Sequence, residues 1–406
     1  MPEKNPYSFA TGGRWLAQRA FLPLLVLASA LSLCQLASAL LESHGTQPAL
    51  TWAARLSPLD HHPRLLLADL EPHRAPLHWG YIRSLYPAYA PAWIRLGLDL
   101  ERQGEFTRAQ RAFAHAARLD RTFLPQWTLA NFHYRRGDAA QFWHYARTAA
   151  SPYQGDLTGV FSLCLRIEPD PLAMLDRLQP AYPAARLDLL GLLLRQQRFT
   201  DAARLAPHAA STPVRGTGEM LLAGCQAANN AGDTASAVAF WNAAAAHRWI
   251  ARAPLDPAQG VLIADSTFHH QPTNACFDWA LPAQNGVLAH AGLPAGLRLE
   301  FSGLQPPGAV VARLRLPVQP GTRYRLVWRY GVEFTPNSAQ PIWRIAGQQT
   351  EPWPLAAQGR EESFEFASGA SSLLDLELLL PPAKGRTRPE GKLRLEWVRV
   401  EPVRSA

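Results

Sequence analysis

Three tryptophans in the C-terminal third of the chain have the type and setting that sugar binding requires. Trp279, Trp343 and Trp353 lie near the ends of predicted strands or beside prolines. Carbohydrate sites use exposed aromatic faces that stack on pyranose rings, flanked by polar groups that bind the hydroxyls. These residues are therefore candidates for glycan binding, with burial in a core as the alternative. Trp328 and Trp397 lie within alternating strands, which favours core packing for both.

Five arginines occupy the polar side of two consecutive predicted strands. They are Arg313, Arg315, Arg323, Arg325 and Arg329. Because a guanidinium group pairs well with a carboxylate, this row could meet an acidic glycan, although a plain solvated face is the alternative. The formal net charge of +8 also favours an acidic partner, such as nucleic acid, anionic lipid or an acidic polysaccharide.

Motifs for catalysis are missing from the sequence. It contains no G-x-S-x-G, no P-loop lysine motif, no H-E-x-x-H and no G-x-G-x-x-G after a strand. No paired carboxylates can be assigned acid and base roles. His269 and His270 lie near Cys276, but adjacent strand residues point to opposite faces, so a metal site is not expected there. We therefore expect a binding protein that is not an enzyme and has no catalytic cofactor.

The cysteines indicate neither a metal site nor a disulfide framework. The chain has Cys34, Cys164, Cys225 and Cys276. They are few, they are widely scattered, and none forms a zinc spacing. We expect them to be packing residues.

An uncharged run from Phe21 to Leu41 is long enough to cross a membrane, because about 20 helical residues span a hydrocarbon core of about 30 Å. Residues 1–20 carry three basic residues and one acidic residue, so the positive-inside rule keeps them cytoplasmic and exports the remainder. We expect a single-pass inner-membrane protein with its bulk in the periplasm and its anchor in lipid. Cleavage as a signal peptide after Ala39 is the alternative, giving a periplasmic or secreted product. Export excludes nucleic acid as a partner.

Residues 42–250 have helical spacing and a repeat of 34 residues. Trp93 and Trp127 are 34 residues apart, and each follows a proline by two residues. This pattern resembles the tetratricopeptide repeat (TPR), a helical hairpin that stacks into a solenoid. The residues that carry the resemblance are Trp93, Leu96, Gly97, Gly104, Ala109, Phe113 and Ala116. We expect four or five hairpins, with an irregular or shortened repeat at residues 151–186.

The TPR resemblance implies a concave surface, lined mainly by the first helix of each hairpin, that binds peptides or partner proteins. Polar residues of two successive first helices are therefore the candidates for partner binding, with simple solvation of the helix faces as the alternative. They are Arg95, Asp99, Arg102, Asn131, Tyr134 and Arg135.

A second architecture begins after a proline-containing linker at residues 251–260. From residue 261 to residue 406 the apolar residues alternate, as in the run Leu297, Leu299 and Phe301. Turn signals separate these runs and no helical pattern intervenes. The sequence therefore predicts an antiparallel β-sandwich and an α + β multidomain chain.

The sandwich resembles a carbohydrate-binding jelly roll of the galactose-binding-like superfamily. The matching segments are ADSTF (264–268), FDW (277–279), GLRLEF (296–301), VQPGTRYRL (318–326) and GKLRLEWVRV (391–400). The resemblance implies a structural calcium ion beside Asp265 and Glu396. However, the Asn-Gly that usually precedes the first Asp is missing, as is the acidic pair of the last strand.

The order of parts resembles uncharacterised bacterial TPR membrane proteins that are associated with surface-polysaccharide loci. This resemblance implies a scaffold, tethered to the inner membrane, that assembles envelope or polysaccharide-assembly proteins. A glycan-binding protein that uses the sandwich is the alternative.

Overall fold

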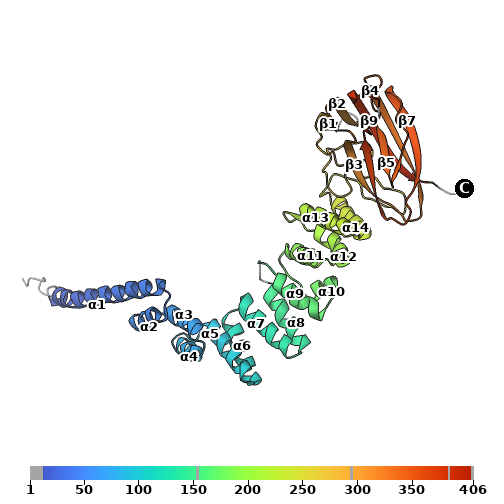
Figure 1. Ribbon diagram of the computed structural model, residues 1–406. Coiled ribbons are helices and arrows are strands. Elements are labelled where there is room, and N and C mark those ends of the chain that lie inside the picture. Colours follow the sequence, from blue (N-terminus) through green and yellow to red (C-terminus); the bar gives the residue numbers. More distant parts are fainter. Residues whose placement is uncertain (1–11, 152–154, 293–295, 383–384, 404–406) are drawn as a thin grey trace, which may run out of the picture. The chain divides into compact units, whose positions relative to one another are not determined.

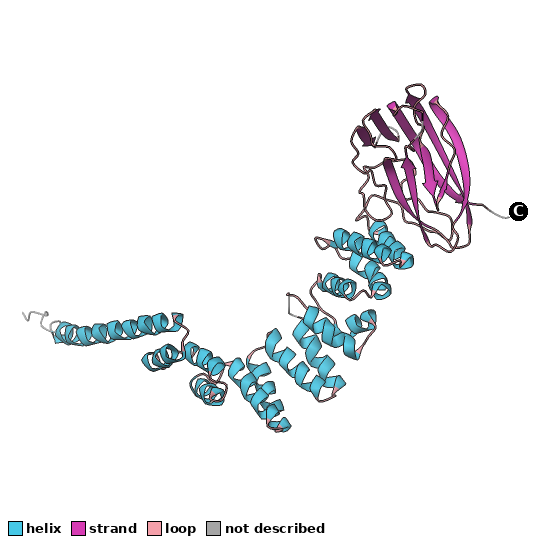
Figure 2. Ribbon diagram, viewed as in Figure 1, coloured by secondary structure: helices cyan, strands magenta, loops and turns pink. Residues whose placement is uncertain are grey.

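A computed structural model describes residues 12–151, 155–292, 296–382 and 385–403 (Figure 1). Helices precede strands along the chain (Figure 2), which confirms the predicted α + β class. Contacts divide the chain into two compact units, one of Met1–Tyr153 with Arg177–Pro180 and the other of Gln154–Asp176 with Ala181–Ala406. The second unit therefore combines helices with the sandwich. Much of the predicted cytoplasmic segment 1–20 lies outside the described residues.

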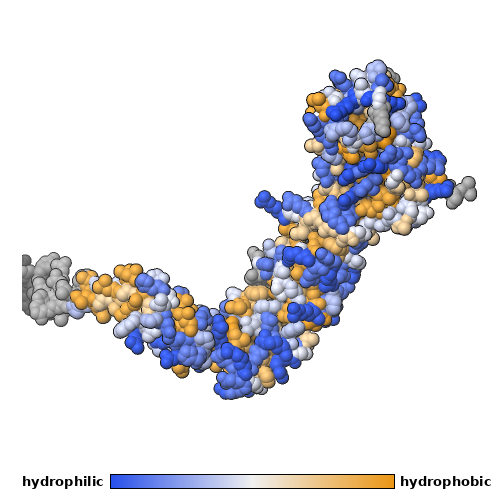
Figure 3. Space-filling model, in the orientation of Figure 1, coloured by the Kyte–Doolittle hydropathy of each residue, from blue (hydrophilic) through white to orange (hydrophobic). Residues whose placement is uncertain are grey.

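The first helix, α1 (Gly12–Ser43), is apolar over most of its length. Among the described helices it alone is long and apolar enough to cross a membrane, through Pro23–Ser43. Several of its leucines, including Leu24 and Leu40, are exposed, and Figure 3 shows its apolar surface. This helix has the length and composition of a membrane anchor or of a signal sequence.

Short helices follow α1. They are α2 (Gln47–Leu56), α3 (His62–Leu70), α4 (Ala75–Leu85), α5 (Ala90–Arg102), α6 (Phe106–Leu119), α7 (Phe123–Arg135) and α8 (Ala139–Ala150). The chain continues as α9 (Thr158–Ile167), α10 (Pro171–Leu178), α11 (Ala185–Arg195), α12 (Phe199–Ala210), α13 (Thr217–Asn230) and α14 (Thr234–Ala246). The pairs α5 and α6, α7 and α8, α11 and α12, and α13 and α14 pack as hairpins.

These four hairpins share one turn. In each, a residue with positive φ follows the first helix, and the next backbone N–H donates to a carbonyl five residues earlier, as from Glu105 to Leu100 at 2.9 Å. The residues with positive φ are Gly104, Gly137, Gln197 and Gly232. Glycine adopts positive φ freely because it has no β-carbon, whereas Gln197 adopts it at a steric cost. The turn therefore repeats even where the sequence signal for it is lost.

Two hairpins are closed by a glycine against a phenylalanine ring. A β-carbon added at Gly97 of α5 would lie 2.5 Å from the ring of Phe113 in α6. One added at Gly224 of α13 would lie 2.7 Å from the ring of Phe240 in α14. Both rings are fully buried. The absence of a side chain at each glycine lets the two helices approach closely.

The sandwich consists of two antiparallel sheets. Its strands are β1 (Val287–Ala291), β2 (Leu297–Ser302), β3 (Val310–Pro317), β4 (Arg323–Phe334), β5 (Ile342–Ile345), β6 (Gln348–Gln349), β7 (Ala356–Ala367), β8 (Leu373–Leu379) and β9 (Glu390–Pro402). The order β1-β2-β9-β4-β7 forms one sheet, and β3-β8-β5-β6 forms the other. Alternating apolar residues such as Leu297, Leu299 and Phe301 fill the core between the sheets, as the alternation predicts.

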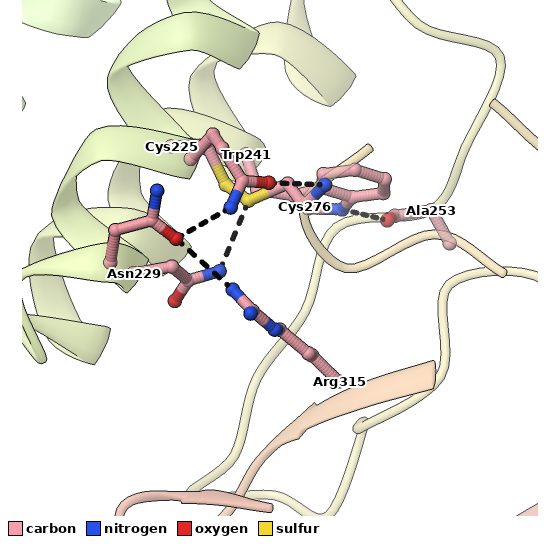
Figure 4. Close-up of a disulfide and its surroundings, with 8 residues drawn as sticks. Cys225, Asn229, Trp241, Ala253, Cys276 and Arg315 are labelled. Atoms are coloured by element: carbon pink, nitrogen blue, oxygen red, sulfur yellow. Dashed lines mark hydrogen bonds between the residues drawn. A yellow bond between two sulfur atoms is a disulfide. The ribbon is translucent and has the colours of Figure 1, made fainter. Parts of the chain in front are cut away.

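The last hairpin is joined to the sandwich by a disulfide. Cys225 of α13 is bonded to Cys276, which precedes β1 (Figure 4). The prediction that all four cysteines are packing residues is therefore wrong. A spacing of 51 residues carries no recognisable motif, and only the fold brings these two cysteines together. Cys34 and Cys164 are free.

The predicted linker at residues 251–260 is a packed connection. Asn242 of α14 exchanges two hydrogen bonds with the backbone of Leu255, at 2.7 and 2.8 Å. The indole N–H of Trp241 donates to the carbonyl of Ala253. Arg252 forms a nearly fully buried ion pair with Asp278 at 2.8 Å. The last helix ends at Ala246, before this segment, and the composition of the segment gives no sign of these contacts.

Gly97→Ala tests the glycine contact in the helical array. The added methyl group meets the buried ring of Phe113, and overpacking of this kind costs about 1–3 kcal/mol. We expect the variant to lower the free energy of unfolding, measured by urea titration of the full chain in detergent with helical circular dichroism. Gly80→Ala is the matched control, because nothing lies within 4 Å of a β-carbon there. Equal stability of the two variants would contradict the packing account.

Candidate binding sites

A groove crosses the first helices of two successive hairpins in the first unit. Its lining comes from α3, α4, α5 and α7, and it encloses about 530 Å³. We call it the first-helix groove. Its apolar part includes Tyr89, Leu98 and Leu124, and Leu124 is 55% exposed. A hollowed apolar surface of this kind is suited to binding a partner.

Three of the six predicted partner-binding residues line the first-helix groove. Arg95 lies 5.4 Å from the centre of the Trp79 ring and 4.0 Å from the carboxylate of Asp69. Asn131 donates through its amide nitrogen to a backbone carbonyl of its own helix. Arg135 completes the set, with its guanidinium group held in place by a carboxylate. The groove therefore offers two guanidinium groups, each paired with a carboxylate, and an amide beside apolar surface.

The other three predicted residues do not line the first-helix groove. Asp99 and Arg102 form an ion pair with each other at 2.6 Å. The ring of Tyr134 packs against Phe142 of α8, with ring centres 6.0 Å apart. The TPR resemblance selected all six as polar residues of the first helices. It could not tell which of them border the groove.

Leu124 is one of the groove residues that the sequence pattern does not identify. It lies at the start of α7, next to Pro125, and most of its side chain is exposed. A single leucine in an apolar helix gives no signal that it lies outside the core. Tyr89 was missed for a similar reason, because it precedes α5 and takes part in no periodic pattern.

The three tryptophans proposed for sugar stacking are buried. Trp279 and Trp353 are 1% exposed, and Trp343 is fully buried. Trp343 lies 5.8 Å from Trp353 and 6.3 Å from Trp279, measured between ring centres. Of the two interpretations, burial in the core is therefore correct, and the three are not exposed stacking platforms. Trp343 lies within β5 itself, whereas Trp279 and Trp353 lie outside the strands, and all three belong to the core of the sandwich.

Trp397 is the opposite case. The register of β4 and β9 shifts between Arg329 and Tyr330, which leaves Glu396 as an extra residue in β9. At such a bulge two consecutive side chains can share one face of the sheet. Trp397 is therefore partly exposed, with the guanidinium group of Arg399 4.6 Å from its ring centre. The expectation that Trp397 packs in the core is wrong, because strict alternation does not anticipate a bulge.

A second groove lies on the outer face of the five-stranded sheet. It encloses about 550 Å³ and is lined by residues of β2, β4, β7 and β9. We call it the outer-face groove. Gly359 forms part of its floor, and a β-carbon there would collide with Arg329 and Glu396. These two residues form an ion pair at 3.0 Å. The missing side chain at Gly359 leaves room for this pair across the sheet.

The predicted row of arginines is divided between the two sheets. β3 carries Arg313 and Arg315, whereas β4 of the other sheet carries the remaining three. Arg313 and Arg344 both contact the carboxylate of Glu377. Burial would raise the pKa of Glu377, but hydrogen bonds from Arg344 and Arg313 outweigh burial and hold it below its usual value. These arginines therefore tie strands together, and they form no continuous surface for a glycan.

The two carboxylates that the resemblance associates with calcium have protein partners. Asp265 accepts hydrogen bonds from the backbone N–H groups of His269 and His270, each at 3.0 Å. Glu396 pairs with Arg329 in the outer-face groove. Within the described residues, no group of three or more His, Cys, Asp or Glu side chains could hold a metal ion.

Comparisons with known proteins give only partial likenesses. No family model matches the chain, and no curated protein matches it. Many solved structures are similar in part, and three of them follow. The CBM22-1 xylan-binding domain of Xyn10C from Paenibacillus barcinonensis is 14% identical, with 35% of this chain and 94% of that one covered and a TM-score of 0.23. pilF of Pseudomonas aeruginosa is 17% identical, with 54% and 92% covered and a TM-score of 0.25.

The third structure is the enzymatically active domain of tailspike protein 4 from bacteriophage CBA120. It is 12% identical, with a TM-score of 0.23, and the match covers 35% of this chain but only 21% of that one. With scores this low, none of the three likenesses indicates what this chain binds or whether it catalyses a reaction.

Proposed function

We propose that the protein is an exported, non-enzymatic scaffold, tethered to the inner membrane with its bulk in the periplasm. It binds a partner protein through the first-helix groove. The observation that carries the proposal is the groove itself, where exposed Leu124 lies among Arg95, Asn131 and Arg135. Apolar surface supplies affinity for a peptide segment, and the polar groups orient its backbone or side chains.

Export is supported by the disulfide between Cys225 and Cys276. Disulfides of this structural kind persist in oxidising compartments such as the periplasm and are rare in the cytosol. This argument is independent of the N-terminal helix. The three basic residues and the single acidic residue that precede the apolar stretch Pro23–Ser43 favour the same orientation.

The role in surface-polysaccharide or envelope assembly is supported by the order of parts. An apolar N-terminal helix, TPR-like hairpins and a sandwich follow one another, as in the bacterial proteins that the sequence resembles. A partner from such an assembly would approach the groove from the periplasmic side. We propose no catalytic role and no cofactor, and the calcium ion remains a proposal drawn from the resemblance alone.

Leu124→Asp tests the first-helix groove. Tagged full-length protein, purified from the membranes of its native host, should recover envelope or polysaccharide-assembly proteins. We expect Leu124→Asp to reduce their recovery about tenfold, because a charge replaces an apolar contact residue. Mass spectrometry of the recovered proteins provides the measurement.

Leu119→Asp is the matched control for this experiment. Leu119 is an exposed leucine at the end of α6 and does not line the groove. Its substitution should leave recovery unchanged. The scaffold proposal fails if no envelope or polysaccharide-assembly protein is enriched, or if both variants reduce recovery equally.

A second candidate function is glycan binding by the outer-face groove. Two observations favour it. Trp397 is partly exposed on the same sheet face, next to the bulged Glu396 that lines the groove. Arg298 and Arg394 also line the groove, and neither forms an ion pair with a described carboxylate. Such a site suits a glycan that carries carboxylates, with the aromatic face stacking on a sugar ring.

Calorimetry of full-length protein with the exopolysaccharide of its own host tests the glycan candidate. We expect Trp397→Ala to weaken binding about tenfold, which corresponds to a lost stacking contact of about 1.4 kcal/mol. Trp52→Ala removes an exposed tryptophan from α2 instead and should leave binding unchanged. If the unaltered protein releases or absorbs no heat at high glycan concentration, it does not bind this glycan and the glycan candidate is wrong.

A further inference from the structure

The last turns of α1 pack against α2, which is the first contact between helices in the chain. Ser38 is 2% exposed, and its hydroxyl donates to the carbonyl of Ala53 in α2 at 3.2 Å. Glu42 contacts the ring of His62, at the start of α3, at 3.0 Å. α2 therefore lies beside the C-terminal part of α1. The apolar stretch Pro23–Ser43 includes these same residues.

This overlap constrains how deeply α1 enters a membrane. If hydrocarbon surrounded α1 as far as Leu41, α2 would lie in hydrocarbon together with Gln47 and Arg55. A charged side chain at that depth costs several kcal/mol. The cost is avoided if the hydrocarbon layer ends near Leu36. The stretch from Ala20 to Leu36 has about 17 residues and spans about 25 Å, which is at the short end of the usual range.

The remaining turns of α1 would then lie in the headgroup layer. Leu36 and Leu40 are 59% and 60% exposed, and they flank Ser38 along the helix. Exposed apolar side chains at the end of a membrane-spanning helix are suited to contact with lipid. Because the hydroxyl of Ser38 is hydrogen-bonded to the carbonyl of Ala53, the neighbouring residues of α2 lie at the same depth in the membrane as the two leucines.

The outward side of α2 and of the turn after it has the chemistry of a membrane interface. Trp52 is 57% exposed, and the guanidinium group of Arg55 lies 5.2 Å from its ring centre. Leu59 is 70% exposed and lies near α1, in a hollow that includes Gln35 and Glu42. Tryptophan is enriched at the headgroup level, and arginine there reaches the phosphates.

We propose that Trp52, Arg55 and Leu59 form an interfacial face that rests in the lipid headgroup layer of the membrane that α1 spans. The inference depends on the proposed tether. It adds that α2 and the turn after it contact the bilayer surface directly and are not separated from it by a flexible linker. It also implies that α1 is retained, because a cut after Ala39 would remove Ser38 and its contact with α2.

A fluorescent label at Trp52→Cys tests the interfacial face. Full-length protein with Cys34→Ala is labelled with bimane and reconstituted into vesicles of phosphatidylethanolamine and phosphatidylglycerol. Cys164 does not compete for the label, because it is fully buried and burial raises the pKa of its thiol to about 12. Leu59→Cys repeats the measurement with Trp52 intact, and Leu119→Cys on α6 is the water-exposed control.

We expect lipids with brominated chains to quench the label at positions 52 and 59, and iodide in the water to quench it roughly threefold less than at position 119, because the interface excludes the anion. Equal iodide quenching at all three positions overturns the proposal. Protection from iodide without quenching by brominated lipid also overturns it, since a second copy of the chain would then cover the face.

The tether is measured separately in the same vesicles. Protein that remains with them after alkaline carbonate treatment is anchored through α1, so an exposed label on such protein defeats only the interfacial face. If carbonate releases the protein, or if protein from the membranes of its own host begins after Ala39, both the tether and the interfacial face are wrong.

Discussion

Close approach of paired helices is the constraint on which the helical part depends. Gly97 against Phe113 and Gly224 against Phe240 are the same contact in two hairpins far apart along the chain. A repeat of this kind buries little apolar surface alone, so it gains stability only when the two helices touch and the next hairpin covers them. The first-helix groove follows from that arrangement, because first helices packed side by side expose residues such as Leu124.

The join between the last hairpin and the sandwich has a different physical basis. A disulfide, a buried ion pair and the paired hydrogen bonds of Asn242 act within one small region. The buried ion pair is costly unless both partners are present, so it specifies one arrangement more than it adds stability. Within the second unit, the sandwich is therefore a fixed extension of the last helices. A glycan bound by the outer-face groove would be held at a defined place beside them.

The sequence predicted the architecture well and the sites poorly. A period of 34 residues, alternation in strands and one apolar run were sufficient for the hairpins, the sandwich and α1. The site predictions failed where tertiary packing decides exposure. Trp343 and Trp353 have the flanking prolines of loop residues but fill the core, whereas a single bulge turns Trp397 outward. The bond between Cys225 and Cys276 could not be predicted, because no local pattern relates residues that only the fold brings together.

Export joins the tether, the groove and the sandwich into one account, and the thiol state of the protein in living cells tests it most directly. Acid-quenched cells of the native host are denatured and alkylated, and the mass of the full-length protein gives the number of free cysteines. The account predicts two alkylated cysteines, Cys34 and Cys164, with Cys225 and Cys276 bonded. Four alkylated cysteines would indicate a reducing compartment and contradict export.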